Sequence, residues 1–228
     1  ALVKDGTAYV EYATAKENLN DHLYKSDEEQ QVILTTAVDI IKLPYDSNEY
    51  TTLTGNGSMP YQIVVSQDGN VYIALDYLAQ YTALQYSVEQ EPLHIIINNQ
   101  WGTKTFSDVI KEESVRLDAD IKSPILKKEA TGDKVTVLEQ EEEWTKVLTA
   151  DGYIGYMKSK KLSDSYEEQV TSDFRAAEYT SIHKDYDMNL LWHQVTSQDS
   201  NDALAADIQD VKGVNVISPT WFSISSND

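Results

Sequence analysis

Cysteine is absent from the 228-residue chain, and so are long apolar runs. Without thiols, neither a disulfide framework nor a thiolate metal site is possible. No stretch of about 18 consecutive apolar residues occurs, so the sequence predicts no membrane-spanning segment. The N-terminal stretch, beginning Ala1-Leu-Val, also lacks the charged and apolar regions of a signal peptide. If the protein is exported, we expect its signal or anchor to be missing from this chain.

Basic side chains are scarce, with 18 Lys and Arg against 38 Asp and Glu and a net charge of −20. A surface of that sign repels nucleic acid and anionic lipid, so we expect neither a nucleic-acid nor a membrane partner. Residues 103–163 are the exception, because they hold 11 basic side chains against 12 acidic ones. This shift in charge marks the middle of the chain as a separate unit.

Signatures of catalysis and of metal binding are missing as well. The sequence has no glycine-rich phosphate loop, no His-Glu-x-x-His helix and no nucleophile elbow. His22 and His94 lie far apart without ligand spacing, so we expect no metal site and no cofactor. Asp202, Asp207 and Asp210 fall on or beside a predicted helix, where capping and solvation explain them. We therefore expect no catalytic residue in this chain.

A repeated pattern organises residues 1–101. Tyr9-Val-Glu-Tyr12 leads into a helical pattern and then a strand over 31–34, and about 63 residues later Tyr72-Ile-Ala-Leu75 leads into a second helical pattern and a strand over 93–97. Neither copy can bury its apolar face alone, so the two together predict one small α+β domain. The apolar residues assigned to the two helical patterns are Ala15, Leu19 and Leu23 in the first and Leu78, Tyr81 and Leu84 in the second.

This strand–helix entry, Tyr72-Ile-Ala-Leu-Asp-Tyr-Leu-Ala, and its earlier echo resemble the copper amine oxidase N-terminal-like domain of exported Gram-positive bacterial proteins. That domain is not the copper-binding one, so the resemblance implies an exported protein and no copper.

Residues 102–163 predict a small all-β unit. Apolar and polar residues alternate with a period of two, as in half-buried antiparallel strands, and a segment this short with this many strands predicts a small barrel. Turns are predicted at Thr131-Gly-Asp133 and Asp151-Gly152. The predicted strands cover 113–117, 123–127, 134–138, 144–148 and 153–157.

Trp144-Thr-Lys-Val147, followed by Asp151-Gly-Tyr-Ile-Gly-Tyr-Met-Lys-Ser-Lys-Lys-Leu162, resembles bacterial SH3-like domains. Many members bind cell-wall peptide or glycan, and many others only brace neighbouring domains. The resemblance implies a ligand groove lined by Trp144, Tyr153 and Tyr156. Since Ile154 and Tyr156 share one face of a regular strand and Tyr153 lies on the other, we expect one tyrosine in the core. The basic run that begins at Lys158 either meets a wall carboxylate or is a solvated surface.

Residues 164–187 are polar and predict an extended connector. The segment 188–228 then predicts strand, helix and strand, with strands over 190–195 and 214–217. The helix is expected over 203–211, capped by Asn201-Asp202 and ended by Gly213. A connection of this length between strands predicts parallel pairing.

Leu191-Trp-His-Gln-Val195 and Val214-Asn-Val-Ile-Ser-Pro-Thr-Trp-Phe222 resemble the first two strands of the (β/α)8 barrel of family 18 glycoside hydrolases. The Asp-x-x-Asp-x-Glu motif of that family is absent here, so no catalytic residue is carried over. The resemblance implies a truncated barrel in which Trp221 and His193 lie near the strand ends that form barrel sites. In a full-length protein they would line a sugar cleft, whereas in this chain packing is the better explanation. The uncovered apolar strands predict self-association through 188–228.

Two functions follow from these patterns. The first is the non-catalytic, cell-wall-associated region that positions an exported family 18-like glycoside hydrolase on peptidoglycan or a related glycan. The alternative is a wall-associated structural or interaction protein without catalytic activity. Both predict an extracellular or wall-associated location.

Overall fold

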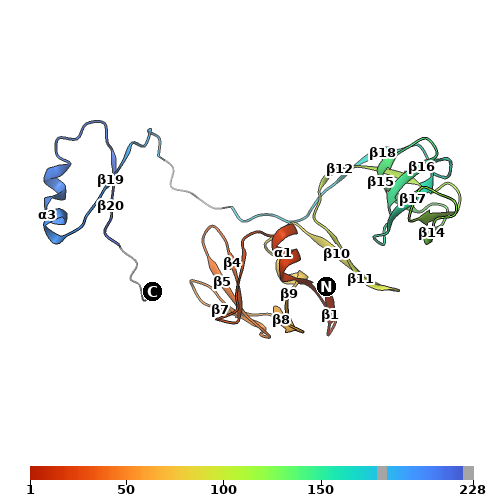
Figure 1. Cartoon of the computed structure of the whole chain (residues 1–228), viewed down its shortest axis with the longest axis horizontal. Helices are drawn as coiled ribbons and strands as arrows, with labels where there is room; N and C mark the ends of the chain where they lie inside the picture. The colour runs from red at the N-terminus through yellow and green to blue at the C-terminus, as the bar shows by residue number, and fades with distance from the viewer. Residues whose placement is uncertain (179–183, 223–228) are drawn as a thin grey trace. The chain divides into compact units, whose positions relative to one another are not determined.

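The computed structural model describes residues 1–178 and 184–222, and the chain forms two compact units, 1–178 and 179–228. Strands dominate, with 45% of the chain in strand and 11% in helix. Figure 1 labels many of the elements used below.

The first sheet brings the two halves of the sequence repeat together. Its four antiparallel strands run in the order β1 (Leu2–Lys4), β2 (Thr7–Glu11), β9 (Asn70–Ala74) and β8 (Val64–Gln67). Helix α1 (Tyr12–Asn18) follows β2 directly and helix α2 (Leu75–Leu78) follows β9. Because β2 pairs with β9, with Tyr9 opposite Ala74, the two similar strand–helix pieces lie side by side.

The β8–β9 hairpin forms where the sequence contains Asp68-Gly69. Both residues have positive φ, 51° and 77°, as a two-residue primed turn requires. The Asp-Gly pair is typical of such a turn, so the local sequence specifies this hairpin.

A five-stranded antiparallel sheet completes the N-terminal part, in the order β3 (Leu23–Ser26), β4 (Gln31–Thr35), β5 (Ile40–Pro44), β6 (Glu49–Thr51) and β7 (Asn56–Ser58). The helical patterns are shorter than expected, since α1 ends at Asn18 and Leu23 begins a strand. The Asn20 side chain accepts a hydrogen bond from the His22 backbone, which turns the chain out of the helix. This part is mostly sheet, and the α+β prediction is not confirmed.

One hydrophobic core joins the two sheets. Tyr77 is fully buried at its centre, with the Tyr50 and Tyr81 ring centroids at 5.7 and 5.5 Å. The hairpin of β10 (Gln85–Gln90) and β11 (Leu93–Asn98) adds half-buried side chains to this core, including Ile95 and Ile97.

A seven-stranded antiparallel sheet follows. Its strand order is β14 (Ile125–Glu129), β13 (Glu113–Arg116), β17 (Ile154–Lys158), β16 (Trp144–Leu148), β15 (Lys134–Gln140), β12 (Gly102–Asp108) and β18 (Tyr166–Val170). All five strands predicted between 113 and 157 are present. A short 3-10 helix, Ser159–Lys161, follows β17. The hydrophobic core of the seven-stranded sheet consists of Val109, Val115, Val135, Val147, Met157 and Leu162.

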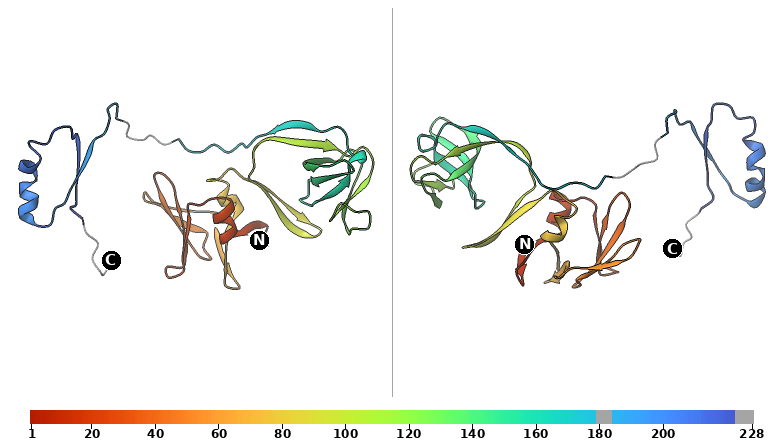
Figure 2. Two further views of the ribbon diagram at one scale, coloured as in Figure 1. Left: turned by 45° about the horizontal axis from the view of Figure 1, so that its top comes forward. Right: turned by 180° about the vertical axis from the view of Figure 1, so that it is seen from behind.

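Strand β18 lies inside the segment predicted to be a connector. It pairs with β12 over five residues, from Phe106 opposite Tyr166 to Gly102 opposite Val170, and the two strands run side by side in Figure 2. Its polar sequence carries no burial signal because four of its five residues are exposed. Of the predicted connector, 179–183 lie outside the described residues.

The second unit contains the predicted strand–helix–strand. Strand β19 (Leu190–His193) pairs in parallel with β20 (Val216–Pro219), which confirms the expected pairing. Helix α3 (Gln198–Asp207) begins earlier than predicted, because Ser197 and Ser200 form a capping box, and the predicted Asn201-Asp202 cap is wrong. The barrel resemblance stays a prediction, and residues 223–228 lie outside the described part of the chain.

Candidate functional site

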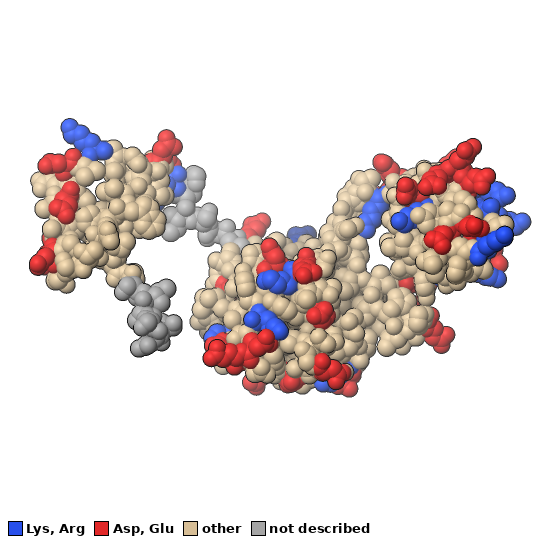
Figure 3. Space-filling model, in the orientation of Figure 1, with Lys and Arg blue, Asp and Glu red and all other residues tan. Residues whose placement is uncertain are grey.

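Strands β16 and β17 present alternate residues to the core and to an outer face. Their register places Trp144 opposite Lys158, Lys146 opposite Tyr156 and Leu148 opposite Ile154. The residues between them, Thr145, Val147, Gly155 and Met157, face inward and are buried. We call the first six residues the outer face. Basic and acidic side chains are interspersed over this part of the molecule (Figure 3).

Tyr156 lies near the middle of the outer face, half-buried, with one cation close to its ring. The Lys146 ammonium is 5.9 Å from the centre of its ring. Arg116 is the residue paired with Tyr156 on β13, and its guanidinium donates to the Ser123 carbonyl at 2.8 Å. An aromatic ring with a cation beside it can stack on an apolar ligand face while the cation binds a carboxylate.

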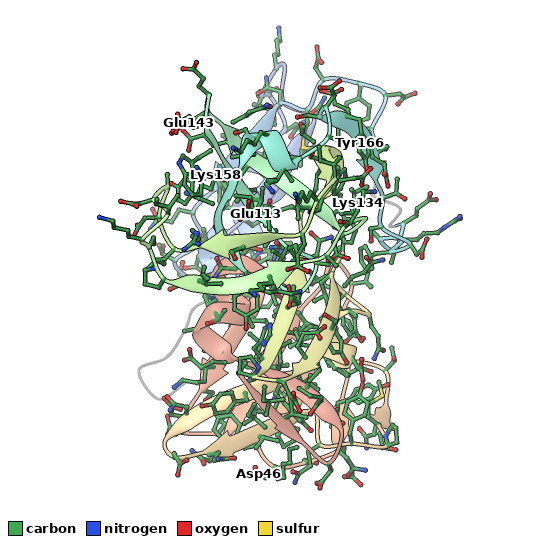
Figure 4. The ribbon with its side chains drawn as sticks, turned by 90° about the vertical axis from the view of Figure 1, so that its right-hand side faces the viewer. Asp46, Glu113, Lys134, Glu143, Lys158 and Tyr166 are labelled. Carbon is green, nitrogen blue, oxygen red and sulfur yellow. The ribbon has the colours of Figure 1, made fainter. Side chains whose placement is uncertain are left out.

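Trp144 shares this face but is only 8% exposed. Lys158 lies over its ring, with the ammonium 4.8 Å from the ring centre. Lys158 and Glu143, which Figure 4 labels, line a polar hollow of about 180 Å³ together with Glu142 and Lys160. Trp144 therefore packs beneath Lys158 and offers little ring surface to a ligand.

Tyr153 does not join the other two aromatic residues. It precedes β17 in the loop 149–153, and its backbone N–H donates to Thr149 Oγ1 at 2.9 Å. Its ring meets the His94 ring edge-on, with centroids 5.9 Å apart. The expectation of one core tyrosine is wrong, because Gly155 and Met157 take the inward positions and both Tyr153 and Tyr156 are half-buried.

A second aromatic group was missed by the sequence analysis. Lys134 lies 4.2 Å from the ring centre of Phe106 and 5.7 Å from that of Tyr166, beside which Figure 4 shows it. The Tyr166 hydroxyl donates to Asp108 at 3.1 Å, and Lys134 also forms an ion pair with Glu168. These contacts attach β18 to the sheet. The only local signal was the aromatic residue at the start of a polar run.

A buried carboxyl group, that of Glu129, lies on β14 at the edge of the sheet opposite β18. Glu129 is 4% exposed, and its Oε1 has no hydrogen-bond partner among the described residues although the Lys127 ammonium lies 3.2 Å away. Burial, followed by a hydrogen bond with Asp133, raises the pKa of Glu129. The pKa of Asp133 is lowered by hydrogen bonds from the Ala130 backbone and from Glu129. Of the two carboxyl groups, Glu129 is therefore the one that holds a proton to higher pH.

Glu129→Gln is expected to stabilise the seven-stranded sheet at neutral pH. The amide can donate to Asp133 at any pH, as the protonated acid does, and the substitution removes the charge whose burial raises the pKa of Glu129. Because the folded-state pKa of Glu129 is raised, its carboxylate costs stability as pH rises above the ordinary value near 4.5.

Thermal unfolding across pH checks this expectation. The gain in melting temperature should be largest near pH 7 and shrink toward pH 4. The exposed Glu143→Gln is the matched control and should change little at either pH. A destabilised Glu129→Gln variant at pH 7 would show that the charge on Glu129 stabilises the sheet, contrary to this expectation.

In the second unit, the two residues predicted to line a sugar cleft, His193 and Trp221, lie at and just beyond the ends of the paired strands β19 and β20. The Thr220 backbone donates to the His193 carbonyl at 3.0 Å, Trp221 Nε1 donates to Asn201 at 2.9 Å, and His193 lies 4.0 Å from Asp207. An apolar hollow of about 190 Å³ lies in this unit but is lined by Leu191, Ile208, Val211, Val214, Asn215, Val216 and Ile217. Neither Trp221 nor His193 lines that hollow.

Within residues 1–178 and 184–222, no group of three or more His, Asp or Glu side chains is placed to hold a metal ion. Among the helices described, none has the length and apolar character needed to cross a membrane.

Comparison with known protein families identifies the domain to which the outer face belongs. Residues 114–163 are a bacterial SH3 domain. The matched residues run from β13 to the end of the 3-10 helix and include Trp144, Tyr153 and Tyr156. Strands β12 and β18 lie outside the matched residues and extend the sheet of the SH3 domain at one edge.

The other comparisons add little. No curated protein matches the chain. A solved structure of NlpC2 from Trichomonas vaginalis is similar at 13% identity, with a TM-score of 0.25. That alignment covers 62% of this chain and 42% of the other, and it supports no statement on fold or function.

Proposed function

We propose that this chain is a non-catalytic, cell-wall-associated targeting region of an exported glycoside hydrolase of the family 18 type. In this proposal its SH3 domain binds peptidoglycan or a related glycan. The observation that carries it is the bacterial SH3 match over 114–163, since such domains commonly bind the cell wall. The chain itself is expected to lack hydrolase activity, because glycoside cleavage needs a positioned carboxylic acid pair.

The outer face supports binding through Tyr156. Tyr156 is half-buried and has the Lys146 ammonium near its ring, whereas Trp144 is covered by Lys158 and Tyr153 contacts His94. Of the three aromatic residues expected in a groove, Tyr156 is therefore our first candidate for ligand contact.

The remaining segments complete the proposal. Residues 1–101 would be the copper amine oxidase N-terminal-like domain and 188–228 the start of the barrel. Trp192 is 74% exposed and Phe222 95% exposed, so the second unit offers apolar surface for self-association.

A second candidate function is a structural brace on the wall without ligand binding. The buried Trp144 and the Tyr153–His94 contact favour it, because they use two expected ligand residues for packing.

Sedimentation with purified peptidoglycan sacculi separates the two. Tyr156→Ala is expected to weaken binding about tenfold, the loss expected when a central interface aromatic is truncated. The Tyr24→Ala variant is the matched control, since Tyr24 is a tyrosine with 48% exposure in the N-terminal part. Binding should persist at high salt, because ring stacking is not screened as exposed charges are. If the wild-type chain stays in the supernatant, the brace is the better account.

A further inference from the structure

The strongest unexplained contact in the first unit centres on His94 of β11. Its Nδ1 lies 2.6 Å from the Pro92 carbonyl oxygen, and its Nε2 lies 2.8 Å from the Asp151 carbonyl oxygen. Carbonyl oxygens only accept hydrogen bonds, and a neutral imidazole has a single N–H. Only the doubly protonated, positively charged ring donates to both oxygens at once.

The groups around the ring favour this charge. Glu89 is paired with His94 across the hairpin, and Asp151 approaches from the loop 149–153. The Asp151 carboxylate is itself held by the Lys127 ammonium at 2.6 Å and by the Thr149 hydroxyl at 2.6 Å. The hydrogen bond to the Asp151 carbonyl, then that to the Pro92 carbonyl, raises the pKa of His94.

Two more titratable groups belong to the surroundings of His94. Glu129 is linked to this group through Lys127, and the Tyr153 ring packs edge-on against the imidazole.

Gly152 allows the loop and the hairpin to approach each other. Its φ of +87° is one that side chains with a Cβ rarely adopt. A Cβ at this position would also lie 3.0 Å from Ile96 Cγ1 and 3.3 Å from Ile96 Cδ1. The contact thus combines a charged hydrogen-bonded ring with a close fit that only glycine permits.

We propose that the β10–β11 hairpin is a pH-dependent latch on the loop 149–153 of the SH3 domain, closed when His94 is protonated. When His94 loses its proton, one of the two carbonyl contacts becomes a repulsion between lone pairs, and the latch weakens. Closing the latch also packs His94 on Tyr153, so the latch controls whether that ring is available. The latch does not depend on the proposed wall binding.

The direction of the pH effect follows from linkage. A histidine whose pKa is raised in the closed state stabilises that state, and this stabilisation is fully present when the pH is below the ordinary histidine pKa near 6.5. That contribution is lost as pH rises through the raised value. The latch is therefore closed in mildly acidic solution and opens toward alkaline pH.

Proton NMR titration of the four histidines in the full chain tests the latch, with His94→Gln identifying the His94 signal. We expect His94 to titrate above the ordinary value and the Tyr153 ring signals to follow the same transition. In His94→Gln the Tyr153 signals should no longer change over that pH range. A His94 signal that titrates at the ordinary value would overturn the proposal.

Two glycine variants separate the contact from backbone strain. Gly152→Ala and Gly132→Ala both place a Cβ at a positive φ, but around Gly132 nothing lies within 4 Å among the described atoms. Of these two glycine variants, only Gly152→Ala should lower the pKa of His94 toward its ordinary value. Ile96→Ala, which removes the packing partner without strain, should lower it in the same direction. Equal effects of both glycine variants, or no effect of Ile96→Ala, would contradict the latch.

Discussion

Gly155→Ala is expected to destabilise the SH3 domain by about 3 kcal/mol, the upper end of the cost of overpacking a core. The added Cβ would lie 2.4 Å from the Arg116 carbonyl oxygen and 2.7 Å from Val115 Cγ1. The first of these atoms is backbone, and the pairing of β13 with β17 holds it in place. Unlike a flexible side-chain end, it cannot move away.

The measurement is segment-resolved hydrogen exchange together with thermal unfolding. For a domain of this size the loss corresponds to a melting temperature lower by about 15 °C. Protection should fall in β13, β16 and β17 and stay unchanged in the N-terminal sheets. Gly55→Ala is the matched control, since Gly55 has an ordinary φ and nothing within 4 Å in the described part of the chain. Equal stability of the two variants would show that the strands separate easily.

Tyr77→Ala is expected to remove about 4 kcal/mol from the stability of the N-terminal part, as truncation of a buried aromatic side chain does. Tyr77 is fully buried and contacts the rings of Tyr50 and Tyr81. The helix that carries it, α2, has only four residues, so packing rather than helix propensity holds it.

Hydrogen exchange again locates the effect. Protection should fall across β2, β4, β5 and β9, while the strands of the SH3 domain keep theirs if the two regions fold independently. The Tyr24→Ala variant, at a site with 48% exposure, is expected to change stability by less than about 1 kcal/mol. A simultaneous loss of protection in the SH3 strands would argue against separate domains at 1–101 and 102–163.

The outer face and the latch use different aromatic residues of the same domain. Tyr156 lies in the middle of the outer face near Lys146, whereas Tyr153 lies in a loop against His94. Wall binding through Tyr156 and packing through Tyr153 are therefore compatible. Variants at the two positions should affect binding and the His94 titration separately.

Local chemistry within a few residues determined much of this protein. The Asp68-Gly69 turn specifies the β8–β9 hairpin through positive φ at both positions. Period-two alternation placed all five strands between 113 and 157. Runs of β-branched and apolar residues separated by a helical stretch were enough to predict the parallel pair of β19 and β20.

Only the tertiary structure decided which aromatic residues face outward and which residues meet across long separations. Strand β18 forms because Tyr166 lies opposite Phe106, 60 positions earlier in the chain, and its own polar sequence carries no sign of a partner. Trp144 is covered because Lys158 lies opposite it, and the ring of Tyr153 is occupied by His94 from a separate hairpin. Glu129 is buried although glutamate side chains are mostly exposed, so its residue type gave no sign of this. Turns and strand periods depend on neighbours along the chain, whereas burial and charge pairing depend on neighbours in space.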